Sequence, residues 1–197
     1  LLMQTRVSIV DVVYTWVNHR DPHWQSLYQR TIDEGVLPEG LHSSVNDMAR
    51  FQNRDELRYS INSIRKYAPW VRNIFIVTNC ELPDWAADEE KIIAVSHGAI
   101  FPKATDLPTF NAFAIEACLH RVPGIAEHFV YFNDDFFLLR PVSIEDFFPA
   151  DGEMSVFLSK HDMPEKWTEN LRPIEYSMLN VREILSQRFG INPQRKL

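Results

Sequence analysis

The sequence predicts an α/β fold in which helices flank a mostly parallel sheet. Between Val7 and Phe132, short apolar segments rich in β-branched and aromatic residues alternate with segments of helical periodicity. Such alternation is typical of parallel sheets, because each helix carries the chain back to the start of the next strand. The opening segment is nearly continuous in apolar residues, which indicates a strand buried on both faces.

The first half of the chain supplies two predicted strands and two predicted helices. Val7–Val17 is the opening strand, and turn residues separate it from a helix at Trp24–Glu34. Asp55–Tyr67 has apolar residues spaced three or four apart, which is the pattern of an amphipathic helix. Asn73–Thr78 is short and apolar, so we expect the second strand there.

The second half continues this alternation. Ile92–Val95 is the third predicted strand, and Thr109–Arg121 fits a helix with Thr109 as its N-cap residue. Phe129–Phe132 is the fourth predicted strand. The alternation weakens further along the chain, where Ile174–Phe189 suggests one more helix.

The overall charge and the cysteine content exclude several classes of protein. A formal net charge of -7 argues against a nucleic-acid partner, because neutralising phosphates requires a basic face. Cys80 and Cys118 are too few for a disulfide framework or a cysteine-based metal site, and they fit reduced thiols in a cytoplasmic protein. The sequence has no signal-peptide pattern and no run of about 18 apolar residues.

Polar residues follow two of the predicted strands directly, at 18–21 and at 133–135. In open α/β sheets, ligands bind beyond the carboxyl ends of the strands. The neighbouring carboxylates of Asp134 and Asp135 could hold Mg²⁺ or Mn²⁺ together with a diphosphate. They lie in an apolar stretch, where burial of unpaired charges is costly and a cation would offset that cost. The alternative is that these residues merely cap a turn.

Two other groups of charged residues each leave two interpretations open. Asp11, inside the opening strand, is either a ligand-positioning residue or a buried hydrogen-bonded carboxylate. Arg50, Arg54 and Arg58 surround the start of a predicted helix, where phosphate oxygens could bind to guanidinium and backbone N–H groups. Surface pairing of these arginines with neighbouring acidic residues is the simpler explanation.

The remaining candidates are an acid, a histidine and two aromatic residues. Glu116 and His120 are four apart in a predicted helix, so they form either a helical pair or a base for an acceptor hydroxyl. Tyr14 and Trp16 fit core aromatics better than a base-stacking platform, although Trp16 adjoins the loop that follows the opening strand.

Several long segments resemble the conserved regions of the Stealth family. These segments are IVDVVYTWVNHRDPHW, RFQNRDELRYSINSIRKYAPWVRNIFIVT, HGAIFP and LPTFNAFAIEACLHRVPGIAEHFVYFNDDFF. They occur in the family's order over most of Val7–Arg140, so the resemblance is far more specific than a short motif. The family includes bacterial capsular-polysaccharide phosphotransferases and the catalytic part of the lysosomal-enzyme N-acetylglucosamine-1-phosphotransferase.

The resemblance implies a fold, a reaction and a cofactor. It implies a GT-A-like, Rossmann-like nucleotide-sugar fold with Mg²⁺ or Mn²⁺ as the cofactor. The implied reaction transfers a hexose or hexosamine 1-phosphate from a UDP-sugar donor to a hydroxyl of a glycan or polysaccharide acceptor, with release of UMP, in capsule synthesis. The alternatives are a GT-A glycosyltransferase that releases UDP, and a nucleotide-sugar or glycan binding module without catalysis.

The same resemblance implies roles for individual residues. Asp134 and Asp135 resemble the family's metal-binding or catalytic acidic pair, and His120 is the candidate base. The expected substrate-binding residues are Tyr14, Trp16, Asn18, Asp21, Arg54, Glu56, Arg58, Asn111 and Glu116. His19 stands where the family's first motif usually has glycine, so the sequence of that loop departs from the family pattern.

The resemblance also sets expectations for the extent and location of the protein. We expect residues 1–150 to form the nucleotide-sugar-binding catalytic core and 151–197 to be a partial C-terminal segment of helix and loop. The family's last conserved region, with a histidine important for activity, is not found before Leu197, so we expect the chain to stop short of it. A cytoplasmic location is expected, with peripheral association to a capsule-assembly complex at the inner membrane face left open.

Overall fold

The structure, a computed structural model, describes residues 7–35, 51–149, 164–168 and 171–191. The chain divides into two compact units, one of residues 1–34 with 51–155 and one of residues 35–50 with 156–197. The sequence-based division at residue 150 places 35–50 in the core instead. Within the described residues, no helix is long and apolar enough to cross a membrane.

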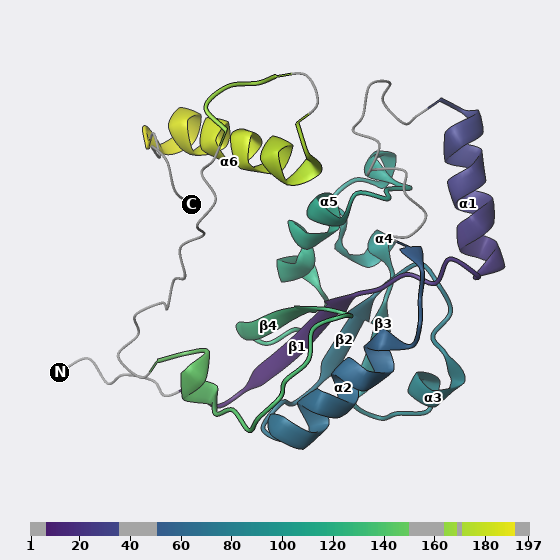
Figure 1. Cartoon of the computed structure of the whole chain (residues 1–197), viewed down its shortest axis with the longest axis vertical. Coiled ribbons are helices and arrows are strands. Elements are labelled where there is room, and N and C mark those ends of the chain that lie inside the picture. The colour runs from purple at the N-terminus through teal and green to yellow at the C-terminus, as the bar shows by residue number, and fades with distance from the viewer. Residues whose placement is uncertain (1–6, 36–50, 150–163, 169–170, 192–197) are drawn as a thin grey trace. The chain divides into compact units, whose positions relative to one another are not determined.

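A parallel sheet forms the centre of the first unit (Figure 1). Its described strands are β1 (Val10–Thr15), β2 (Ile74–Val77), β3 (Ile92–Val95) and β4 (His128–Asn133), in the order β3-β2-β1-β4. Each neighbouring pair is parallel, and Thr15 at the end of β1 is aligned with Val77 and Asn133. The carboxyl ends of β1, β2 and β4 therefore meet at one edge, as the predicted α/β fold requires.

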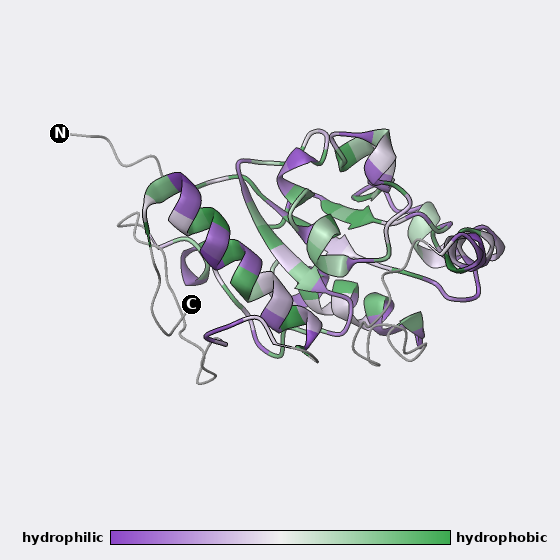
Figure 2. Ribbon diagram, turned by 90° about the horizontal axis from the view of Figure 1, so that it is seen from above, coloured by the Kyte–Doolittle hydropathy of each residue, from purple (hydrophilic) through white to green (hydrophobic). Residues whose placement is uncertain are grey.

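Helices cover both faces of this sheet, and alternate residues of β1 face them. Val12 and Tyr14 pack on the face covered by α2 (Glu56–Tyr67). Val13 packs on the opposite face, among residues of α4 (His97–Ile100), α5 (Ala112–Glu116) and the 3-10 helix η4 (Leu119–Arg121). Strand side chains alternate between faces, so β1 contributes to both halves of the core. The strands are mostly hydrophobic in Figure 2.

The remaining described elements surround this core or belong to the second unit. They are α1 (Pro22–Asp33), α3 (Asp84–Ala87), η3 (Ala104–Asp106), η5 (Ile144–Asp146) and α6 (Pro173–Phe189). In the second unit, α6 confirms the predicted helix and ends at Gly190, whose φ of 65° is the left-handed conformation that glycine adopts readily. Arg182 of α6 donates hydrogen bonds to the carbonyl oxygens of Pro164 and Glu165.

The predicted helix Thr109–Arg121 is wrong in its extent. Asn111 is the N-cap residue in place of Thr109, because its Oδ1 accepts the Phe113 N–H at 3.0 Å. The Cys118 N–H bonds to a carbonyl three residues back rather than four, which tightens the chain and ends α5. Glu116 and His120 consequently do not share one continuous helix.

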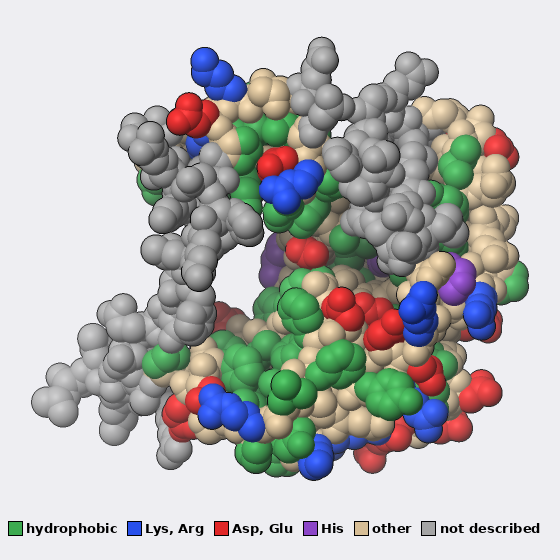
Figure 3. Space-filling view, viewed as in Figure 1, with side chains coloured by type: hydrophobic (Ala, Val, Ile, Leu, Met, Phe, Trp, Pro, Cys, Tyr) green, Lys and Arg blue, Asp and Glu red, His purple; other side chains and the backbone are tan. Residues whose placement is uncertain are grey.

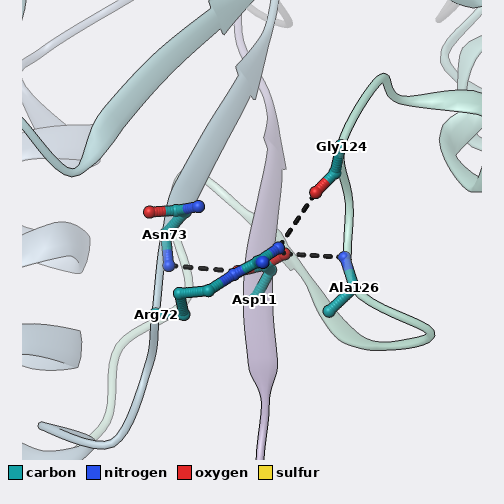
Figure 4. Close-up of polar contacts among 5 residues, drawn as sticks. All are labelled: Asp11, Arg72, Asn73, Gly124 and Ala126. Carbon is teal, nitrogen blue, oxygen red and sulfur yellow. Dashed lines mark hydrogen bonds and ion pairs between the residues drawn. The ribbon is translucent and has the colours of Figure 1, made fainter.

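Asp11 is a fully buried carboxylate that joins three segments at the amino ends of the strands (Figure 4). Arg72 donates to it through Nε at 2.9 Å and through a terminal nitrogen at 2.5 Å. The backbone N–H groups of Asn73 and Ala126 donate to it at 3.1 and 2.7 Å, and Arg72 also reaches the Gly124 carbonyl at 2.9 Å. Of the two interpretations, the structure supports the buried hydrogen-bonded carboxylate.

We expect Asp11→Ala to lower the free energy of unfolding by about 3 kcal/mol, because two backbone N–H groups lose their buried acceptor. Urea denaturation of the wild type and the variant measures this. The matched control is Glu89→Ala, which removes the partly exposed Arg65–Glu89 pair at 2.9 Å and should cost about 0 to 1 kcal/mol. Equal losses in the two variants would contradict the structural role of Asp11.

Candidate functional site

The predicted acidic pair lies in a turn directly after β4, at the carboxyl edge of the sheet. The Phe136 N–H closes the turn by donating to the Asn133 carbonyl at 3.1 Å. Asp134 is partly buried and Asp135 is exposed. Burial and, after it, the negative charges of Asp135 and Glu56 together raise the pKa of Asp134 to about 6. Glu56, at the start of α2, therefore belongs to the same acidic group.

Two serines of α2 hold the chain that carries this pair. Ser60 donates to the Phe136 carbonyl, and the Tyr14 hydroxyl lies 2.7 Å from the Ser60 hydroxyl. Since the single hydroxyl proton of Ser60 goes to Phe136, Tyr14 donates to Ser60. Ser63 accepts the Leu138 N–H at 2.9 Å. The acidic turn is thus fixed to α2 and, through Tyr14, to β1.

The same attachment continues to the far end of α2. The Val142 N–H donates to the Tyr67 carbonyl at 2.9 Å. The indole N–H of Trp70, just beyond the helix, donates to the Val142 carbonyl at 2.8 Å. Figure 3 shows acidic side chains gathered beside a hydrophobic area on the face that α2 contributes to. The segment from the acidic pair to Val142 therefore follows α2 along its length.

A second polar group lies on the other face of the sheet. The Tyr131 hydroxyl is 2.9 Å from Thr15 Oγ1, 2.7 Å from Asn133 Oδ1 and 3.2 Å from Glu116 Oε1. Burial raises the pKa of Glu116, and the hydrogen bond from Tyr131 partly opposes that rise. Burial raises the pKa of Tyr131, and the charges of both Glu116 and Asp134 add to that rise. Glu116 and Asp134 therefore approach the same carboxyl edge from opposite faces.

The loop after β1 is held mainly by backbone contacts. Trp16 is buried in the α2 side of the core, and Asn18 donates its backbone N–H to Cys80 Sγ at 3.3 Å. Asp21 is the N-cap residue of α1, since it accepts the Trp24 N–H, and its other oxygen accepts the Glu81 N–H, both at 2.9 Å. The carboxylate of Asp21 thus already has two backbone partners, which hold its pKa below the usual range against the opposing effect of burial.

The predicted arginines lie at the start of α2. Arg54 and Arg58 are exposed, and Arg58 pairs weakly with Asp55 at 3.9 Å. Asp55 has a φ of 72°, a left-handed conformation that costs energy for residues other than glycine. The Arg54 N–H donates to the Glu56 carboxylate at 2.5 Å. Arg50 falls outside the described residues.

The structure brings some predicted residues together and leaves others apart. Tyr14, Glu56, Asp134 and Asp135 are linked on the α2 side by contacts or electrostatic interaction. Within the described part of the chain, no hydrogen bond or ion pair joins His120 to any of them. Sequence reasoning missed Ser60, Ser63, Thr15 and Tyr131. Ser60 alone left a signal, since it is a polar residue on the apolar face of a helix.

The acidic pair fits a cation that is shared with a substrate. Among the residues that the structure describes, no group of three or more His, Cys, Asp or Glu side chains could hold a metal ion. Mg²⁺ commonly binds one or two protein carboxylates and takes its other ligands from water and substrate phosphates. Asp134 and Asp135 supply oxygen ligands of this kind, so they fit such a shared site.

The fold and the acidic edge define a class of protein. A parallel sheet with acidic side chains beyond its carboxyl edge is the arrangement of Rossmann-like α/β proteins that bind ligands at that edge. A sequence model described as Stealth protein CR2, conserved region 2, matches residues 50–156, which is more than half of the chain. The chain belongs to the Stealth family.

Curated relatives carry consistent names. A capsular polysaccharide phosphotransferase of Aeromonas hydrophila is 43% identical, over 83% of this chain and 46% of its own length. An exopolysaccharide phosphotransferase of Streptomyces coelicolor is 42% identical, over 92% and 33%. A capsular polysaccharide phosphotransferase of Neisseria meningitidis is 39% identical, over 93% and 50%. The chain thus spans half of the length of these relatives or less.

We expect Asp134→Asn to stabilise the protein at high pH and to have little effect near pH 4. The pKa of Asp134 is about 6 in the folded protein, above the 3.8 of an ordinary aspartate, so the folded state loses stability relative to the unfolded state as pH rises through this range. The full shift corresponds to at most about 3 kcal/mol, and partial exposure reduces it to about 1 kcal/mol at pH 8.

Urea denaturation at pH 4 and pH 8 measures this difference, without added divalent cations. The matched control is Asp88→Asn, which neutralises an exposed carboxylate after α3. A gain for Asp134→Asn that is the same at both pH values, or that equals the control, would contradict the predicted cost of ionising Asp134.

Proposed function

We propose that this chain forms the donor site of a phosphotransferase. The proposed enzyme moves a hexose or hexosamine 1-phosphate from a UDP-sugar to a hydroxyl of a polysaccharide, and UMP leaves. The observation that carries the proposal is the acidic pair at the carboxyl edge of the sheet, in a chain whose relatives are named capsular and exopolysaccharide phosphotransferases. The UDP-sugar donor and the release of UMP follow from the family resemblance.

The acidic side chains would bind the cation in the proposed reaction. Asp134 and Asp135 would hold Mg²⁺ or Mn²⁺, which neutralises charge on a bound diphosphate. The oxygen of the acceptor hydroxyl attacks the β-phosphorus of the donor, the bond from that phosphorus to the bridging oxygen breaks, and UMP leaves with that oxygen. Positioning and electrostatic stabilisation dominate phosphoryl transfer of this kind.

The acceptor hydroxyl must lose its proton during this step. Glu116 is partly buried beside the carboxyl edge, and burial raises its pKa, which makes it a stronger proton acceptor than an ordinary carboxylate. His120 is exposed on η4 and lies outside the contacts of the acidic edge. We therefore assign the base to Glu116, which replaces His120 as the preferred candidate within this chain.

Binding of the donor involves residues that the structure leaves exposed or partly exposed. Arg54 and Arg58 at the start of α2 are exposed to phosphate oxygens, and the partly buried Asn18 lies in the loop that follows β1. Tyr14, Trp16, Asp21 and Asn111 bind substrate only as predictions from the resemblance, since their described contacts are with the protein itself. The cytoplasmic location and the peripheral association with a capsule-assembly complex also stay predictions from sequence.

Phosphorus NMR of the full-length protein tests the proposed reaction. With a panel of UDP-hexoses and UDP-hexosamines, an oligosaccharide acceptor and Mg²⁺, we expect a new phosphodiester signal together with UMP. Release of UDP would identify a glycosyltransferase instead. Donor binding by calorimetry without any turnover would identify a binding module.

Variants of the acidic pair test the site itself. We expect Asp134→Ala and Asp135→Ala each to lower kcat/KM at least about 100-fold, because the cation that neutralises the diphosphate would lose a protein ligand. Glu89→Ala, which changes a carboxylate away from the site, is the control and should keep wild-type kcat/KM. Full activity in the presence of a chelator, with no Mn²⁺ binding detected by electron paramagnetic resonance, would contradict the metal assignment.

A further inference from the structure

The Tyr131 hydroxyl joins three segments at the carboxyl edge of the sheet. Thr15 Oγ1 of β1 lies 2.9 Å away, Asn133 Oδ1 of β4 lies 2.7 Å away, and Glu116 Oε1 of α5 lies 3.2 Å away. Tyr131 is partly buried, and burial is the largest cause of its raised pKa, so the phenol keeps its proton at any pH where the protein functions.

The phenol has a single proton, which limits the hydrogen bonds that it can donate at one time. A phenol has one proton to donate, and its oxygen accepts from other donors. The Asn133 oxygen and an ionised Glu116 are both acceptors only, so they compete for that proton. Thr15 donates to the phenol oxygen in either case, because its hydroxyl carries a proton whatever the protonation state of Glu116.

The acceptor of the phenol proton differs between the two protonation states of Glu116. When Glu116 is ionised, the phenol donates to it and the Asn133 oxygen loses its donor. When Glu116 has taken a proton, its own O–H donates to the phenol oxygen, and the phenol proton is free to satisfy Asn133. Rotation about one C–O bond therefore supplies Glu116 with a partner both before and after proton uptake.

We propose that Tyr131 is a positioning residue that holds Glu116 at the carboxyl edge of the sheet and serves both of its protonation states. The role of Glu116 as base rests on the proposed function, whereas the link between Tyr131 and Glu116 rests on the distances alone. Phenylalanine at this position would keep the ring in the core and remove only the hydroxyl.

We expect Tyr131→Phe in the full-length protein to lower kcat about 10- to 100-fold while the KM for the UDP-sugar changes less than about 3-fold. A loss confined to kcat indicates an interaction needed in the transition state rather than in ground-state binding. The matched control is Tyr59→Phe, which removes a phenol that is 65% exposed on α2 and should leave both constants unchanged. Wild-type kcat in Tyr131→Phe would overturn the proposal.

A second readout is independent of turnover. Carbon NMR of protein labelled at the glutamate carboxyl carbon, with Glu116→Gln to assign the signal, measures the pKa of Glu116 directly. Because the phenol favours the ionised carboxylate, Tyr131→Phe should raise that pKa and Tyr59→Phe should not. If wild-type protein releases UDP or fails to turn over, the proposed function fails, and this measurement still decides the link: an unchanged pKa refutes it.

Discussion

The buried Asp11 carboxylate fixes the alignment on which the rest of the first unit depends. It binds Arg72 and Asn73, which precede β2, and Ala126, which precedes β4. The central strand is therefore tied to both neighbours at their amino ends. A parallel strand that slipped by one residue would turn every side chain to the opposite face. The alignment of Thr15 with Asn133 at the other end of the sheet follows from this arrangement.

Because side chains alternate along the strands, two groups of polar residues lie on opposite faces of the sheet at its carboxyl edge. Residues on the α2 side bring the acidic turn into place through hydroxyl groups, and on the α5 side the Tyr131 hydroxyl contacts Glu116. The sheet itself lies between the two groups. A ligand at the carboxyl edge would contact both, which is how an open α/β sheet combines residues from distant parts of a chain.

Much of the fold and part of the site could be predicted from the sequence. The strands are rich in β-branched and aromatic residues, and the position of Asp134 and Asp135 directly after an apolar strand makes them candidates from sequence alone. The end of α5 at Glu116 could not be predicted, since it depends on the Cys118 N–H bonding three residues back instead of four in a segment of ordinary helix formers. The roles of Ser60 and Ser63 depend on partners 76 and 75 residues away, which local patterns do not reveal.

The attachment of the acidic segment to α2 has a thermodynamic consequence. The helix and the segment share contacts from Ser60 to Trp70, so a displacement of one is a displacement of the other. The exposed arginines stand at the amino end of the same helix. An anion bound at these arginines that shifts the helix would therefore change the affinity of the acidic pair for a cation. Because binding linkage is reciprocal, the cation would change the affinity of the arginines for the anion by the same factor.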